Sequence, residues 1–186
     1  MSFSYLGNKK WKEISRDERF FCSHLYFELM KDPLPFLSLL CERGIIEKSE
    51  LSVESWETAF EVCFYRDLIF NLGHENIYKI GSTKFKHLAK RTFDLCIFSE
   101  NHIIIIEAKA QGGFDSKQMS SFRQDLLIIT DLVPAKTKVT FLGLTSSKYT
   151  PKKATQDNFL EILSWKNVYA CYPDSLFLRA DEIFRK

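Results

Sequence analysis

Three charged residues stand in stretches of the sequence where buried strands are expected. Glu107 and Lys109 directly follow four consecutive isoleucines, Ile103–Ile106. Such a β-branched run is typical of a strand that is covered on both faces, and a charge at its end must be paired or used. Asp94 lies in the middle of a second strand-like stretch, Arg91–Phe98. Two carboxylates and one ammonium brought together in this way would suit the hydrolysis of a phosphodiester on a divalent cation.

The spacing of these residues predicts where they meet. Side chains alternate along a strand, so Glu107 and Lys109 point to the same face. The turn at 99–101 is short enough for a hairpin, and such a hairpin pairs Asp94 approximately with Glu107 or Ala108. A slip of one residue would turn Asp94 to the other face. The prediction of a shared site therefore depends on the register.

The chemistry expected of this set is metal-dependent. Mg²⁺ takes oxygen ligands and keeps several waters that a substrate phosphate can replace, and Mn²⁺ is the alternative cation. Lys109 would position or deprotonate the attacking water and offset charge in the transition state. The competing interpretation is a same-face ion pair of Glu107 and Lys109 at the exposed end of a strand, which is common and contributes little energy.

The elements that must position these residues follow from apolar spacing and from turn signals. Ser15 and Glu18 form a capping-box pattern, and helices are predicted over 16–31, after Pro35, over 52–72, from Asp115 or Ser116 onward, and over 155–166. Strands are predicted over 77–85, 91–98, 102–110 and 138–144. This order predicts an α/β fold in which helices pack on a mixed sheet.

Composition limits the class of protein. The 186 residues fit a single domain, 1–186. The net charge of +2, from 26 basic and 24 acidic residues, does not by itself indicate a polyanionic partner. Any nucleic-acid site must therefore depend on a local basic patch. Five cysteines without a C-x-x-C pair indicate a reducing compartment. No signal peptide and no membrane-spanning run are recognised, and a cytoplasmic location is expected.

The order strand, turn, apolar strand, E-A-K and helix resembles the PD-(D/E)xK, or restriction-endonuclease-like, nuclease superfamily. The resemblance covers about residues 52–145 and implies an αβββαβ core, with a helical addition at 1–51 and a C-terminal addition at 146–186. It implies that Asp94 and Glu107 bind metal and that Lys109 acts on the nucleophilic water. The chain departs from the pattern where Phe93, not proline, precedes Asp94. A competing D-x-K at 115–117 follows two glycines and is predicted to cap the next helix.

Further site residues are suggested by the same resemblance. Members often supply another acid from the helix before the first strand, and Glu61 is the candidate here, with Glu57 as an alternative. A solvated helix face explains both equally well, and Glu18 is explained as the capping-box acid. Gln111 and Gln118 resemble positions of accessory polar residues, although ordinary polar surface also accounts for them.

Basic residues precede the Asp94 strand and recur in a later loop. The first cluster is the predicted nucleic-acid contact, because phosphate binding uses such patches; it consists of Lys84, Lys86, Lys90 and Arg91. The second comprises Lys148, Lys152 and Lys153, with Tyr149 interleaved. Solubility alone also explains surface lysines.

Together these features predict a single-domain, Mg²⁺-dependent nuclease that cleaves DNA. The resemblance to the family implies an endonuclease of restriction or defence type as the first expectation, and a homodimer is one possible form. Two alternatives stay open. One is a catalytically inactive module of the same fold that binds nucleic acid or protein, and the other is an RNA-directed or junction-specific nuclease. No zinc-ligand spacing, P-loop or G-x-S-x-G motif supports another class of hydrolase.

Overall fold

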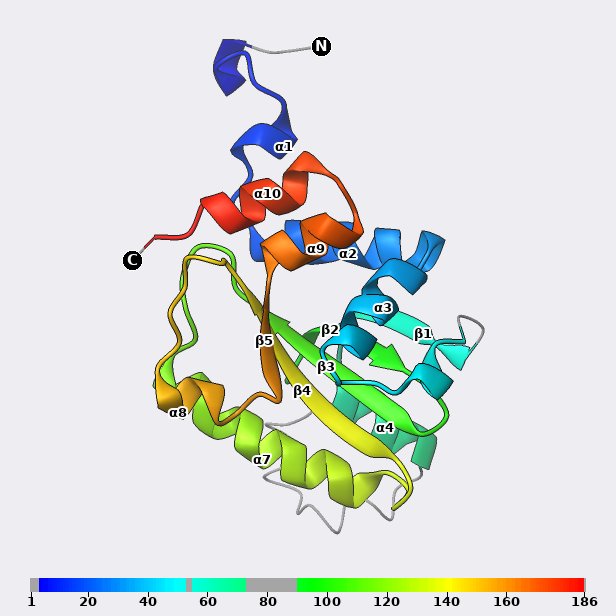
Figure 1. Ribbon diagram of the computed structural model, residues 1–186. Helices are drawn as coiled ribbons and strands as arrows, with labels where there is room; N and C mark the ends of the chain where they lie inside the picture. The colour runs from blue at the N-terminus through cyan, green and yellow to red at the C-terminus, as the bar shows by residue number, and fades with distance from the viewer. Residues whose placement is uncertain (1–3, 53–54, 73–89, 186) are drawn as a thin grey trace.

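The computed structural model describes residues 4–52, 55–72 and 90–185. They form an α/β fold around a mixed sheet of five strands (Figure 1). The strands lie side by side in chain order: β1 (Glu57–Val62), β2 (Phe93–Phe98), β3 (His102–Ala108), β4 (Lys138–Thr145) and β5 (Glu161–Ser164). The first three are antiparallel to one another, whereas β3, β4 and β5 are parallel. The predicted α/β class with a mixed sheet and flanking helices is confirmed.

Helices cover both faces of this sheet (Figure 1). One layer contains α2 (Glu18–Lys31), α3 (Leu34–Glu42), α9 (Trp165–Cys171) and α10 (Ser175–Glu182). The other contains α4 (Phe64–Leu72) and α7 (Ser116–Leu132). Short helical turns complete the described chain: Ser4–Leu6, α1 (Trp11–Ile14), Lys48–Glu50 and α8 (Lys153–Gln156). None of the helices in the described residues is long and apolar enough to cross a membrane.

Strand β3 is the centre of the core. All of its residues are buried, and its apolar residues alternate between two hydrophobic clusters. Ile104 and Ile106 pack with the layer of α2, α3, α9 and α10, while Ile103 and Ile105 pack with the layer of α4 and α7. The isoleucine run is therefore explained by a strand covered on both faces. By the same alternation Glu107 faces the layer of α7.

The predicted hairpin of β2 and β3 and the helix that follows it are present. Helix α7 begins after Asp115, whose side chain accepts a hydrogen bond from the Gln118 amide at 2.8 Å. A side-chain cap of this kind satisfies one of the free amides in the first helical turn. The helix then carries the chain from β3 to the parallel strand β4, as parallel pairing requires.

Two predicted helices are wrong. Residues 57–62 of the predicted helix 52–72 form strand β1, and the α-helix in this range, α4, covers Phe64–Leu72. The predicted helix 155–166 contains the end of α8, all of β5 and the start of α9. In both segments an apolar pattern fitted helical spacing, but pairing with a neighbouring strand decided the local structure. The predicted strand 77–85 lies outside the described residues.

The start of α2 also differs from the prediction. Asp17, not Ser15, is its N-cap, and the Asp17 side chain accepts a hydrogen bond from the Arg19 amide at 3.0 Å. Ser15 instead ends α1. The carboxylate of Glu18 is thus not needed for a capping box with Ser15, and it is available for another contact.

Candidate active site

The hairpin register brings the two predicted carboxylates opposite each other. Leu95 pairs with Ile106, so the next positions along the ladder are Asp94 and Glu107. Antiparallel residues that lie opposite each other have side chains on the same face. The Asp94 Oδ2 atom also accepts a hydrogen bond from the Ala108 amide at 2.8 Å. This bond fixes the Asp94 side chain at the carboxyl end of β3.

Glu107 is held from two sides. Its side chain is almost completely buried, and its Oε1 atom accepts a hydrogen bond from Lys109 Nζ at 3.3 Å. The same oxygen accepts a hydrogen bond from Gln118 Nε2 in the first turn of α7. Because Asp115 caps that turn, the start of α7 is the element that places Gln118 over the strand end. Gln118, predicted as an accessory polar residue, is therefore in contact with a predicted metal ligand.

Lys109 connects the end of strand β3 to helix α2. Its Nζ atom lies 3.3 Å from Glu107 Oε1 and 3.3 Å from Glu18 Oε1 at the start of α2. The backbone of Lys109 is fixed as well, because its amide donates to Leu144 O at 2.7 Å and its carbonyl accepts from Trp165 Nε1 at 3.0 Å. A long side chain anchored in this way can hold its ammonium in one place.

Burial and mutual repulsion raise the pKa values of the two carboxyl groups. Burial raises the pKa of Glu107 to about 8, and the negative charge of Asp94 adds to the shift against the opposing effect of Lys109. The pKa of Asp94 is also raised by burial, although the Ala108 amide and Lys109 act in the opposite direction. Two carboxylates that lie opposite each other in a largely desolvated site repel each other, and the Lys109 ammonium alone does not offset this repulsion for Glu107.

Lys109 is an ammonium in this arrangement. Burial lowers its pKa, but the charges of Glu107, Glu18 and Asp94 outweigh burial and raise the pKa above its ordinary value. A protonated lysine donates hydrogen bonds and offsets negative charge, and it does not accept a proton. Of the two roles predicted for Lys109, positioning and charge stabilisation fit this geometry better than deprotonation.

The acid that joins the site from outside the hairpin is Glu18. Sequence reasoning favoured Glu61, on a helix that the structure replaces with strand β1. Phe60 pairs with Leu95 and Val62 pairs with Phe93, so Glu61 of β1 lies opposite Asp94 of β2. Its carboxylate forms an ion pair with Arg19 at 2.9 Å and is 39% exposed. The alternative acid, Glu57, is exposed on the same strand.

Gln111 does not contact the two carboxylates. Its Nε2 atom donates a hydrogen bond to Arg16 O at 2.9 Å, and its carbonyl accepts one from the Arg185 amide at 2.8 Å. Gln111 therefore ties the segment before α2 to the C-terminal end of the described chain. It is a structural link beside the site, whereas Gln118 reaches into it.

The four residues of the predicted basic patch do not form one surface among the described residues. Lys84 and Lys86 lie outside the described residues, and Lys90 is exposed. Arg91 points inward instead: its Nε atom lies 2.5 Å from Oδ2 of buried Asp125, and its guanidinium lies over the rings of Phe93 and Phe122 at 5.2 and 4.9 Å. This arginine belongs to the core, and its charge also lowers the pKa of nearby Glu107.

The oxygens of the hairpin carboxylates fit a hard divalent cation. Each carboxylate uses one oxygen in the contacts above, and the other, Asp94 Oδ1 or Glu107 Oε2, has no hydrogen-bond partner among the described residues. Mg²⁺ is usually held by one or two carboxylates, with waters and substrate phosphate completing its shell. Within those residues no group of three or more His, Cys, Asp or Glu side chains is arranged to hold a metal. A two-carboxylate site does not need one.

No protein-family model, no curated protein and no solved structure matches the chain. The geometry of the site is thus the basis for a functional assignment. That geometry contains an acid pair at the carboxyl end of a buried strand, an ammonium between two acids, and an amide that orients one of them. Ligands of open α/β sheets commonly bind outside the carboxyl ends of the strands.

Proposed function

We propose that the protein is a Mg²⁺-dependent nuclease that hydrolyses phosphodiester bonds, with DNA as its substrate. The observation that carries this proposal is the position of Asp94 opposite Glu107, with the Lys109 ammonium 3.3 Å from Glu107. The close placement of buried Glu107 and partly buried Asp94 is unfavourable in itself, and it would become favourable if the two carboxylates held a divalent cation. Mn²⁺ offers similar chemistry to oxygen ligands.

The order of the elements supports the same assignment. Among the described elements, α2, β1, β2, β3, α7 and β4 occur in the αβββαβ order that the resemblance to PD-(D/E)xK nucleases implies. Helix α3 and the turn Lys48–Glu50 are inserted between α2 and β1, and helix α4 is inserted after β1. In this correspondence α2 takes the place of the helix that precedes the first strand, and Glu18 is the acid that it brings to the site in place of Glu61.

Each residue then has a distinct part in the reaction. Bound at Asp94 and Glu107, the metal would polarise the phosphate and favour ionisation of a bound water. The Lys109 ammonium would offset the charge that develops at the phosphate. Its three hydrogen bonds go to Glu18, Glu107 and the Ala108 carbonyl, so a hydrogen bond to the attacking water would replace one of them. Glu18 holds the Lys109 side chain in place, and Gln118 orients the Glu107 carboxylate. The last two are positioning residues, comparable to the outer partners of metal ligands.

An inert module of the same fold explains the site less well. Burial of Glu107 with its pKa raised to about 8 costs stability at neutral pH. A protein that only binds nucleic acid or protein would gain from an apolar or amide residue at this position. The pairing of buried Glu107 with half-buried Asp94 is therefore better explained by metal binding and catalysis than by a role in folding.

The proposal is tested by incubating the purified protein with supercoiled plasmid, linear duplex DNA and RNA in Mg²⁺ or Mn²⁺. Glu107→Ala and Lys109→Ala are the test variants, and Lys136→Ala, at an exposed residue between α7 and β4, is the control. We expect cleavage by the wild type and by Lys136→Ala, and a loss of at least about 100-fold in both test variants. Equal cleavage by all four proteins, or cleavage by none of them, contradicts the assignment.

A further inference from the structure

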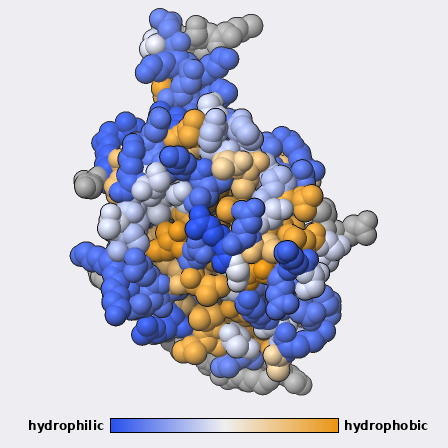
Figure 2. All heavy atoms as spheres, viewed as in Figure 1, coloured by the Kyte–Doolittle hydropathy of each residue, from blue (hydrophilic) through white to orange (hydrophobic). Residues whose placement is uncertain are grey.

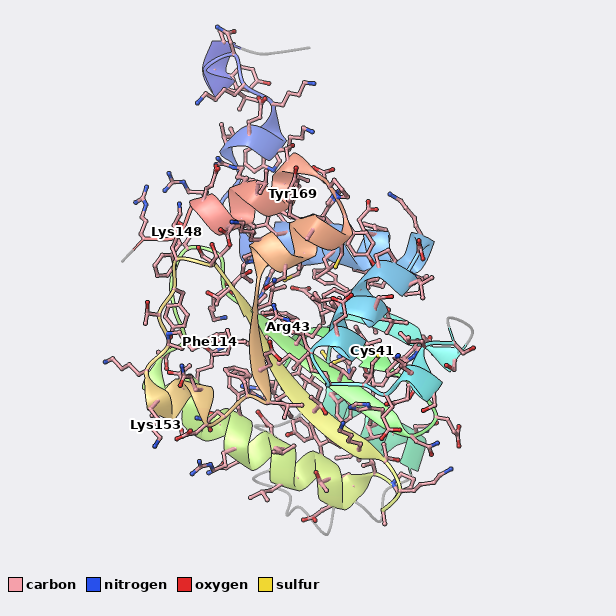
Figure 3. All side chains as sticks on the ribbon, in the orientation of Figure 1. Cys41, Arg43, Phe114, Lys148, Lys153 and Tyr169 are labelled. Carbon is pink, nitrogen blue, oxygen red and sulfur yellow. The ribbon has the colours of Figure 1, made fainter. Side chains whose placement is uncertain are left out.

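A cavity of about 770 Å³ lies beside the candidate active site, between the first half of α7 and the segment 149–158. Its volume is within the range of sites that bind small molecules. The second basic cluster predicted from the sequence borders this cavity, since Lys152 lines it and Lys148 and Lys153 flank it in the chain. Figure 3 shows Phe114, Lys148 and Lys153 on the same side of the molecule.

One residue layer separates the cavity from the acid pair. The ring of Phe114 lines the cavity, and its centroid is 5.9 Å from Lys109 Nζ. Asp115 also lines it and caps α7 through the amide of Gln118, whose side chain contacts Glu107. A ligand in the cavity would therefore lie next to the place where the scissile phosphate is expected.

The aromatic wall of the cavity is fixed in position. The Tyr149 ring lies against the backbone of Gly113, where a Cβ atom would be only 2.2 Å from Tyr149 Cε2. The same ring packs edge-on against Phe114 and against Phe184, with centroids 6.1 and 5.8 Å away. A ring that cannot move freely offers a stacking surface at a small entropic cost. Nucleic-acid bases stack on such rings with little dependence on base identity.

The charges of the lining favour an uncharged ligand. Arg123 and Lys152 contribute two positive charges, and Asp115 and Asp157 contribute two negative ones, so the lining has no net formal charge. A phosphate needs an excess of positive charge, whereas a base is neutral and presents both donors and acceptors. The exposed Leu127 adds apolar surface, and Figure 2 shows hydrophobic residues gathered over α7 and the start of β5, between hydrophilic ones.

We propose that this cavity binds a nucleobase of the strand that is cleaved, next to the scissile phosphate. The inference rests on the proposed function. The Tyr149 ring, against which the buried Phe114 packs edge-on, provides the stacking surface, while Arg123 and Lys152 line the rim, where they would approach the adjoining backbone phosphates. The cavity would add affinity without base-specific recognition.

A binding assay in EDTA separates this inference from catalysis. The probes are two labelled single strands of about ten nucleotides, one with all its bases and one with abasic sugars throughout, and fluorescence anisotropy gives their dissociation constants. Ala154→Trp fills the cavity from α8, and Tyr149→Leu keeps bulk against Gly113 but removes the aromatic ring. The control is Ala170→Trp, which introduces the same side chain at an exposed alanine on α9, outside the cavity. Thermal denaturation checks that each variant is folded.

The measured quantity is the ratio of the two dissociation constants. We expect the abasic strand to bind at least about fivefold more weakly to the wild type and to Ala170→Trp. The ratio should fall at least about threefold in Ala154→Trp and in Tyr149→Leu, since one stacked base is lost. An unchanged ratio in both cavity variants overturns the inference, even if the wild type cleaves DNA. A changed ratio without cleavage in any metal supports the cavity and refutes the catalytic proposal. Failure to bind either strand overturns the inference as well.

Discussion

Lys109 Nζ lies 3.3 Å from Glu18 Oε1, although the two residues are 91 positions apart in the chain. This contact joins the start of α2 to the end of β3. It makes Glu18 part of the site and gives the ammonium acidic partners on two sides, Glu18 and Glu107. An ammonium between two acids keeps one position more firmly than one in a single exposed ion pair.

The first prediction concerns Glu18. Glu18→Gln removes a charge that holds Lys109, and we expect the rate of cleavage to fall by about 10-fold to 100-fold with little change in the affinity for DNA. Glu61→Gln is the matched control, because its carboxylate pairs with Arg19 and not with Lys109. Single-turnover cleavage by the two variants measures the difference. A larger loss in Glu61→Gln would restore the original assignment of that residue as the additional acid.

The second prediction concerns Gln118. Because its side chain orients Glu107, Gln118→Ala should weaken the apparent affinity for Mg²⁺ by about 10-fold. The control is Gln111→Ala, since Gln111 bonds to Arg16 O and not to a carboxylate of the site. The Mg²⁺ concentration that gives half-maximal cleavage is the quantity to compare. If both glutamine variants need the same Mg²⁺ as the wild type, Gln118 has no role in positioning the ligand.

The third prediction concerns stability and pH. The pKa of Glu107 is about 8 in the folded protein and about 4.5 without the fold. The folded state thus binds this proton more tightly, and the free energy of unfolding falls as pH rises between these two values. Glu107→Gln removes the loss, so without metal its Tm should exceed that of the wild type by at least about 3 °C at pH 9. Near pH 4.5 the difference should vanish. A variant less stable than the wild type at pH 9 would contradict the shift.

The fourth prediction concerns Arg91. Its ion pair with buried Asp125, which also accepts a hydrogen bond from Tyr65 at 2.5 Å, lies in the core. Arg91→Ala leaves the carboxylate buried without its cation and should cost about 3–5 kcal/mol of stability. Lys90→Ala, at the exposed neighbour, should cost less than about 0.5 kcal/mol. Urea denaturation measures both. An Arg91→Ala protein of normal stability and weakened DNA binding would return Arg91 to the nucleic-acid contacts predicted from sequence.

The sequence alone predicts the β2–β3 hairpin and the placement of Asp94 and Glu107, because both are determined by residues that lie close together in the chain. The isoleucine run identified a strand buried on both faces, and the short turn after Phe98 fixed the register to within a residue. Asp115 was likewise recognisable as a helix cap. In each of these cases the residues that decide the structure lie within a few positions of one another.

The rest depends on contacts between distant segments. Trp56, Ala59 and Phe60 fit a helical stripe, and only pairing with β2 makes that segment a strand. No glycine or proline marks the change from β1 to α4 at Cys63. The contact of Glu18 with Lys109 and the inward position of Arg91 depend on how helices pack on the sheet. No local pattern encodes either of them.

The central claim is that Asp94 and Glu107 together bind a divalent cation, and calorimetric titration with Mn²⁺ tests it without any assumption about the substrate. We predict one binding event in the wild type that is lost in Asp94→Asn and in Glu107→Gln. It should be kept in Asp174→Asn, where the acid replaced lies beside His24, away from this site. Undiminished Mn²⁺ binding by Asp94→Asn and Glu107→Gln, or no binding by the wild type, would contradict the account.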